Sequence, residues 1–133
     1  MMVRFYRISA IILAFLLIWC QSPNTKIGTL SVEEVKQKIE AGEDIVFWDV
    51  RTSEEYDGPF GHIPGSMLLP LQELEARLHE LEDLKEKEII VYCRTQNRSG
   101  TAVDILRKHG FKNVTNMIGG MIIWQEMSAG ADN

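Results

Sequence analysis

The 133-residue sequence has few cysteines and prolines, and it has no excess of positive charge. Its two cysteines, Cys20 and Cys93, form no cluster with histidine at metal-ligand spacing, so we expect no metal and no cofactor. The net charge of −5 at pH 7 argues against nucleic acid as a partner, because binding phosphates requires a basic face. With only four prolines, 45% hydrophobic residues and no repeat or low-complexity tract, the chain is expected to form one packed, monomeric domain.

The first twenty residues differ in kind from the rest of the chain. Arg4 and Arg7 precede an apolar stretch, residues 8–20, that a single serine interrupts. As a helix this stretch would span about 20 Å, short of the roughly 30 Å hydrocarbon core of a membrane, and the pattern is typical of an export signal. Leu17-Ile-Trp-Cys20 resembles a bacterial lipobox, although Trp19 occupies the position of a small residue, and Cys20 is therefore the candidate lipidation site.

Three outcomes are open for residues 1–20: a lipoprotein signal, an uncleaved membrane anchor, or a cleaved signal that releases a soluble product. All three place the folded part outside the cytoplasm, in the bacterial cell envelope, and the first two anchor it to the membrane. Residues 21–28 are expected to form a polar tether, and residues 29–130 the folded domain. A disulfide between the two cysteines would require an oxidising compartment, and a lipidated Cys20 could not form it.

The apolar pattern predicts strands that alternate with helices. Ser31 and Glu34 form a capping box at the start of a helix that ends near Gly42. Leucines at helical spacing predict a helix over residues 71–81, and further helices are predicted before His109 and around Trp124. Apolar runs of strand length occupy residues 45–50, 67–69, 89–92 and 114–118. This alternation predicts an α/β fold, a parallel sheet with helices on both faces, in which ligands bind at the carboxyl ends of the strands.

The stretch VYCRTQNRSG, residues 91–100, places Cys93 at such a strand end, just before a predicted helix. Two interpretations are open: Cys93 packs as a small hydrophobe, as free cysteines commonly do, or it is a nucleophile. A short loop that curls into a helix can direct backbone N–H groups and the helix dipole at one point, which favours an anion or a thiolate. Arg94 and Arg98 would add positive charge for an anionic substrate, unless they form surface ion pairs.

Several motifs follow one another along the chain: Asp49-Val-Arg51, Glu55-Tyr56, Gly61-His-Ile-Pro-Gly65, the loop from Cys93 to Ser99, and Gly119-Gly120 before Trp124. Their order, over residues 29–127, resembles that of single-domain rhodaneses, which have a five-stranded parallel sheet. The resemblance implies that Cys93 accepts a sulfane sulfur as a persulfide and passes it to a nucleophile such as a thiol or cyanide. It also implies that the backbone of the loop cradles the outer sulfur, through Arg94, Thr95, Gln96, Asn97, Arg98 and Ser99.

Two features depart from the family's pattern. Gln96 stands where the family's loop has glycine, and a glutamine forced into positive φ would cost on the order of 1 kcal/mol, which would reshape the loop or lower its reactivity. The turn Asp57-Gly-Pro-Phe60 is slightly longer than the common form, and we expect it to alter the rim of the pocket.

Three residues outside the loop are expected to support it. Asp49, at a strand end, is expected to accept hydrogen bonds from nearby loops, and Arg51 is expected to pair with a carboxylate such as Glu55. His62 has the chemistry of a general base, but it lies in a turn that a proline stiffens, so we expect it to be structural.

The function that these residues favour is that of a sulfurtransferase, which moves a sulfane sulfur from a small anion such as thiosulfate, or from polysulfide, to a thiol or cyanide. The alternative is a module with little turnover, either a sulfane-sulfur carrier or a protein-interaction domain, and the departure at Gln96 leaves it open. A cysteine-dependent phosphatase or arsenate reductase is disfavoured, because such enzymes have five residues between cysteine and arginine, whereas only four separate Cys93 from Arg98.

Overall fold

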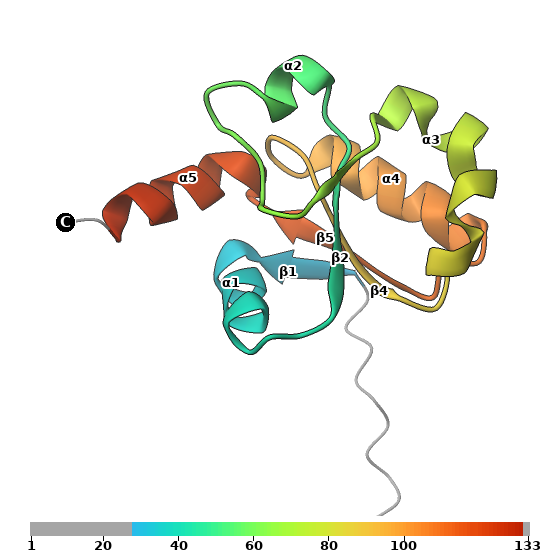
Figure 1. Ribbon diagram of the computed structural model, residues 1–133, viewed down its shortest axis with the longest axis horizontal. Helices are drawn as coiled ribbons and strands as arrows, with labels where there is room; N and C mark the ends of the chain where they lie inside the picture. The colour runs from blue at the N-terminus through green and yellow to red at the C-terminus, as the bar shows by residue number, and fades with distance from the viewer. Residues whose placement is uncertain (1–27, 132–133) are drawn as a thin grey trace, which may run out of the picture.

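The computed structural model describes residues 28–131, which form a parallel sheet between two layers of helices (Figure 1). The expected α/β fold with a five-stranded parallel sheet is confirmed, and the strands lie in the order β1-β5-β4-β2-β3. Their bounds are β1 Thr29–Ser31, β2 Ile45–Asp49, β3 Met67–Leu68, β4 Glu88–Tyr92 and β5 Asn113–Ile118. The export signal, the lipidation candidate Cys20 and nearly all of the tether lie outside the described residues.

In the part of the chain that the structure describes, five α-helices and one 3₁₀-helix connect and cover the strands: α1 Val32–Glu40, α2 Ser53–Tyr56, α3 Leu71–Arg77, η1 Leu78–Leu84, α4 Asn97–Lys108 and α5 Gly120–Gly130. The predicted capping box is present at α1, where Ser31 and Glu34 bond each other's backbone N–H groups. Within residues 28–131, no helix combines the length and apolarity needed to cross a membrane.

The helix expected over residues 71–81 ends as an α-helix at Arg77 and continues as η1. The leucines of this segment explain the change. Leu78, Leu81 and Leu84 are three residues apart, which is the period of a 3₁₀-helix, so the tighter winding directs all three toward the core.

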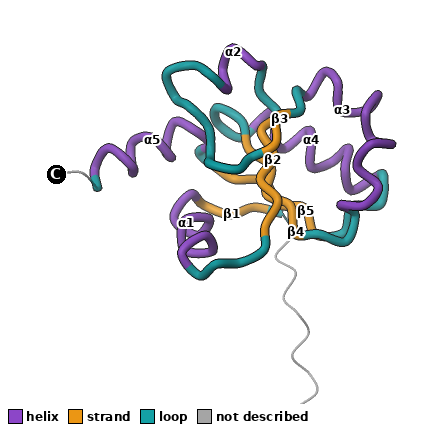
Figure 2. The backbone as a smooth tube through the Cα atoms, viewed as in Figure 1, coloured by secondary structure: helices purple, strands orange, loops and turns teal. Residues whose placement is uncertain are grey.

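The core consists of two apolar clusters, one on each face of the sheet. Strand β4 contributes to both, because Ile89 and Val91 face the layer of α3, η1 and α4, whereas Ile90 and Tyr92 face the layer of α1 and α5. The arrangement of these helices around the strands can be followed in Figure 2. Coverage of both faces explains why the strands read as continuous apolar runs rather than alternating ones.

Because every strand pair is parallel, the carboxyl ends of the strands share one edge of the sheet. Among the segments that leave the sheet at this edge are those after β2, β4 and β5. They bring Asp49, Cys93 and Gly119 to the same end of the molecule, and the candidate site is built from these loops.

Candidate functional site

Cys93 follows directly after the central strand β4, and its side chain is buried, at 1% exposure. It points to the same face as Val91, into the cluster beneath α4. The side chain of Cys93 does not face an open pocket: its sulfur is enclosed, and the Oγ atom of Ser99 lies 3.3 Å from it. Enclosure by a helix N-terminus and a polar hydroxyl distinguishes its surroundings from those of a cysteine packed only by hydrocarbon.

The start of α5 holds the loop after Cys93 from the other side. The N–H of Met121 donates to the carbonyl of Cys93 at 3.0 Å, and that of Ile122 to the carbonyl of Arg94 at 3.2 Å. This approach requires Gly120, because a Cβ atom there would lie 2.5 Å from the carbonyl oxygens of Cys93 and Thr95. Gly120 also has a φ of +54°, which glycine adopts without strain. The sequence analysis used this glycine only as part of a motif, and the structure gives it a contact with the loop.

Gln96 begins α4 as its N-cap residue, with φ −157° and ψ −8°. Its φ is not positive, so the strain expected from a glutamine at this position is absent. The expectation that this strain reshapes the loop or lowers its reactivity is therefore wrong. Asn97, Arg98 and Ser99 form the first turn of α4, and the positive end of the helix dipole is therefore beside Cys93.

Asn116 on β5 is a site residue that the sequence analysis missed. It is 8% exposed, and its register partner on β4 is Val91, so its side chain lies on the same face of the sheet as that of Cys93. Its Oδ1 atom accepts a hydrogen bond from Ser99 at 2.6 Å, and its Nδ2 atom donates to the carbonyl of Gln96 at 3.0 Å. A polar residue two positions after Val114, on the buried face of an apolar strand, was the available signal.

Arg98 forms a two-bond ion pair with Glu55 on α2, at 2.6 and 2.7 Å. These bonds hold the pKa of Glu55 at about 2, well below its usual range, so the carboxylate remains charged. The positive charge of Arg98 is therefore largely balanced by Glu55. The ion-pair alternative considered for the arginines holds for Arg98, and Arg98 is less available to an anionic substrate than its sequence position suggests.

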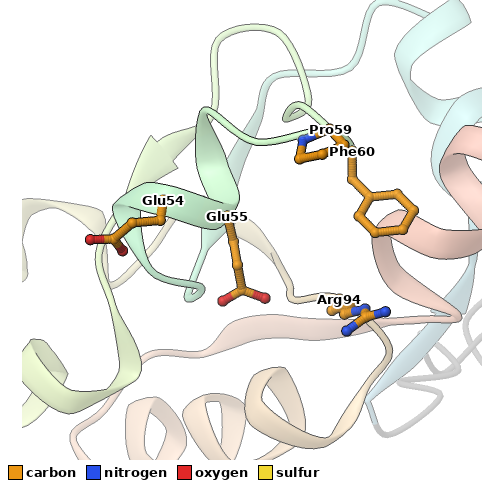
Figure 3. A pocket seen from close by; sticks show the side chains of 5 residues that line it. All are labelled: Glu54, Glu55, Pro59, Phe60 and Arg94. Carbon is orange, nitrogen blue, oxygen red and sulfur yellow. The ribbon is translucent and has the colours of Figure 1, made fainter.

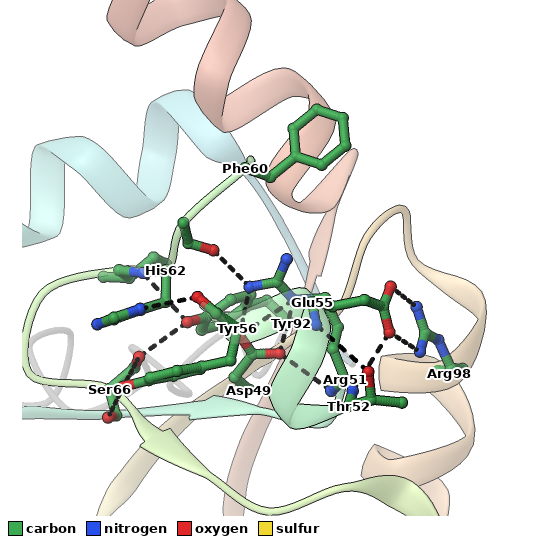
Figure 4. A network of polar contacts seen from close by, with 12 residues as sticks. Asp49, Arg51, Thr52, Glu55, Tyr56, Phe60, His62, Ser66, Tyr92 and Arg98 are labelled. Carbon is green, nitrogen blue, oxygen red and sulfur yellow. Dashed lines mark hydrogen bonds and ion pairs between the residues drawn. The ribbon is translucent and has the colours of Figure 1, made fainter. Parts of the chain in front are cut away.

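Arg51 pairs with a carboxylate, as expected, but its partner is Asp49 rather than Glu55 (Figure 4). Both side chains are buried, at 1% and 0% exposure, and the guanidinium binds both carboxylate oxygens. Arg51 also donates to the carbonyl of Gly61 at 2.6 Å, which fixes the Gly61–Gly65 turn against the end of β2. Asp49 thus accepts hydrogen bonds from the loop, in the position expected for a structural acceptor.

The same turn is held by aromatic side chains. Tyr92 donates to Ser66 at 2.8 Å and accepts from the N–H of Ile63, and burial raises the pKa of Tyr92, so that its hydroxyl stays protonated. The exposed ring of His62 stacks on Tyr56 with 3.7 Å between ring centroids, and its Nδ1 atom lies 3.0 Å from the Tyr56 carbonyl. These contacts tie His62 to α2 and give it a structural place.

A pocket of about 270 Å³ opens beside the loop, between Glu54, Glu55, Pro59, Phe60 and Arg94 (Figure 3). Pro59 and Phe60 belong to the long turn that departs from the family's pattern, and that turn does form the rim. The guanidinium carbon of Arg94 lies 5.6 Å from the Phe60 ring centroid. Within the described part of the chain Arg94 has no ion-pair partner, so it contributes the unbalanced positive charge of this region.

Of the remaining loop residues, Thr95 is half-buried and Asn97 is exposed. Among residues 28–131, no three His, Cys, Asp or Glu side chains are grouped so that they could hold a metal ion.

Comparison with known proteins gives a consistent result. Residues 31–127 match the rhodanese-like domain family. YrkF of Bacillus subtilis, whose name describes a proposed sulfur carrier, is 39% identical over 75% of this chain and 52% of that protein, so the chain spans about half of its length. A protein named sulfurtransferase from Allochromatium vinosum is 31% identical over 74% of this chain and 88% of that protein. The human single-domain sulfurtransferase TSTD1 has a similar structure, with a TM-score of 0.63 and 27% identity over 74% of this chain and 95% of that chain.

Proposed function

The chain belongs to the rhodanese-like family, and from this premise we propose that it transfers sulfane sulfur from a small anionic donor through a persulfide on Cys93. Sulfur transfer in general is supported by the family and by the sulfurtransferases among its relatives. The observation that carries the finer proposal is the placement of Cys93 at the carboxyl end of β4, against the N-terminus of α4 and next to the unpaired charge of Arg94.

The chemistry has two steps. In the first, the Cys93 thiolate attacks the outer sulfur of a donor such as thiosulfate, an S–S bond forms at Cys93, and sulfite leaves with the electron pair of the broken S–S bond. In the second, a thiolate or cyanide attacks the outer sulfur of the persulfide, and the Cys93 thiolate is released. The helix dipole and Arg94 favour the anionic species in both steps.

A carrier with little turnover is the second candidate, and the burial of Cys93 favours it. Because the Cys93 side chain is 1% exposed, small reagents reach the sulfur only after the loop moves, and this movement would slow each transfer of sulfur to or from Cys93. The relative whose name describes a proposed sulfur carrier supports the same function.

Intact mass spectrometry after incubation with thiosulfate tests the proposal, with Cys93→Ser as the matched control. We expect the protein to gain one sulfur, about 32 Da, and to lose it to cyanide as thiocyanate, whereas the control gains nothing. Loading with rapid turnover identifies a sulfurtransferase, and loading with slow release identifies a carrier. Absence of any gain with thiosulfate and with polysulfide would overturn both.

We also propose that residues 1–20 export the domain and anchor it in the cell envelope, with Cys20 as the lipidated residue. The basic and apolar pattern of these residues supports this location. Labelling of growing cells with a radioactive fatty acid should mark the protein but not its Cys20→Ala variant, and equal labelling of the two would remove Cys20 from the proposal.

A further inference from the structure

A chain of hydrogen bonds of fixed direction runs from Gln96 to Cys93. The carbonyl of Gln96 accepts from the N–H of Gly100 at 2.9 Å and from Asn116 Nδ2 at 3.0 Å, which uses both of its lone pairs. A carbonyl can only accept, so the NH₂ group of Asn116 must face Gln96. A Cβ atom at position 100 would lie 3.3 Å from Asn116 Nδ2, so Gly100 leaves just enough room for the amide.

This orientation turns the Oδ1 atom of Asn116 toward Ser99, at 2.6 Å. A hydroxyl has a single proton, and at this distance it lies between Ser99 and Asn116. The hydroxyl of Ser99 is also within donating distance of the Cys93 sulfur, 3.3 Å away, but its one proton serves the shorter contact to Asn116, so Ser99 presents a lone pair to the sulfur. A lone pair suits a neutral thiol, whose S–H can donate to it, and it opposes a thiolate.

Deprotonation of Cys93 would break this chain. If the Ser99 proton turned to the thiolate, two oxygen atoms would face each other at 2.6 Å with no proton between them. Ser99 is fully buried and Asn116 is 8% exposed, so solvent is a poor substitute for the lost partner.

We propose that Asn116 is a positioning residue that acts through Ser99 to favour the neutral thiol of Cys93 while no sulfur is bound. The inference rests on the proposed function, in which Cys93 is the sulfur acceptor. It makes the unloaded protein less reactive toward oxidants and alkylating agents. A persulfide has no proton on the inner sulfur, so the restraint applies to the unloaded state.

The charges around Cys93 set the background for this effect. On the neighbouring elements Asp49 is paired with Arg51, and Glu55 on α2 is paired with Arg98 on α4. The charge of Arg98, although paired with Glu55, also interacts with Cys93 and favours the thiolate, so it acts against Asn116. The proposal is therefore tested by changing Asn116 while these charges stay in place.

The experiment measures the rate of Cys93 alkylation by iodoacetamide as a function of pH, by peptide mass spectrometry. Asn116→Leu removes the acceptor and frees the Ser99 hydroxyl for the thiolate, so the profile should move to lower pH, with roughly tenfold faster alkylation at neutral pH, the effect of one hydrogen bond to a charged group. Asn116→Asp retains an acceptor for Ser99 but loses the donor to Gln96. Its profile should not move to lower pH, which separates the restraint on Ser99 from the tie to the loop.

The test is completed in a protein that already carries Ser99→Ala. Adding Asn116→Leu to it should leave the pH profile of Cys93 alkylation unchanged, because the Ser99 hydroxyl through which Asn116 acts is absent. An unchanged profile in Asn116→Leu, or the same shift with and without Ser99, would overturn the proposal. An infrared spectrum of the Cys20→Ala variant, which retains Cys93 as its one thiol and leaves Asn116 and Ser99 in place, supplies a measurement that no defect of the Asn116 variants can obscure. A hydrogen-bonded S–H band, absent when Cys93 is also replaced by serine, is expected, and a band at the position of a free thiol would contradict the donor role of Cys93. Neither measurement uses a sulfur donor, so failure of sulfur transfer leaves both results interpretable.

Discussion

Replacement of Gly120 by alanine tests whether the start of α5 shapes the Cys93 loop. The added Cβ would lie 2.5 Å from two carbonyl oxygens and 2.6 Å from the carbonyl carbon of Arg94, all of them backbone atoms that cannot rotate away. Relieving such a contact costs about 1–3 kcal/mol. The φ of +54° adds about 1 kcal/mol for any residue with a Cβ. We expect Gly120→Ala to lower the free energy of unfolding by about 2–4 kcal/mol.

Gly42→Ala is the matched control, because Gly42 has a φ of +71° and no atom within 4 Å of an added Cβ. It carries the same conformational cost and the same change in unfolded-state entropy, so it should lose only about 1 kcal/mol. Urea unfolding of both variants measures the difference, and sulfur loading by mass spectrometry should fall in Gly120→Ala alone. A stability loss in Gly120→Ala no larger than that in Gly42→Ala would refute the close contact between α5 and the loop.

Three further predictions concern the charged residues. Arg51→Met should lower the free energy of unfolding by about 3–5 kcal/mol in urea, because it leaves Asp49 charged and buried, and a loss below about 1 kcal/mol would contradict the buried pair. The ion pair with Arg98 holds the pKa of Glu55 at about 2, so the pair stabilises the fold above pH 4.5, and this contribution is lost as the pH falls toward 2. Glu55→Gln should therefore flatten the pH dependence of the free energy of unfolding between pH 4.5 and pH 2. An unchanged slope would refute the pairing. Arg94→Ala should slow loading from thiosulfate more than loading from a neutral sulfur donor, whereas Arg98→Ala, whose charge Glu55 balances, should affect the two donors alike; the reverse ranking in a loading assay would contradict the assignment of the free charge.

The partners of the buried and half-buried arginines, Arg51 and Arg98, could not be predicted from the sequence. Glu55 was named as an example of a partner for Arg51, and it lies four residues further along the chain. In the fold, Arg98 reaches Glu55 across 43 residues of sequence, and Arg51 turns back to Asp49. Partner choice among several charges depends on distances that only the folded chain defines. Strand β1 was missed for a related reason, since its three residues have no apolar run and owe their strand conformation to pairing with β5.

The amino-acid order was sufficient for the α/β class, for four of the five strands that the structure describes, and for the place of Cys93 at a strand end. Apolar runs, helical spacing, the Ser31 capping box and glycine at turns are local signals, and each reflects a preference that a short segment carries with it. The tertiary structure decided three other features: the enclosure of the Cys93 sulfur, the negative φ of Gln96, and the hydrogen bonds that run from Gln96 through Asn116 to Ser99. These features depend on the direction of single hydrogen bonds between β4, α4 and β5, and such directions exist only once the three elements have packed together.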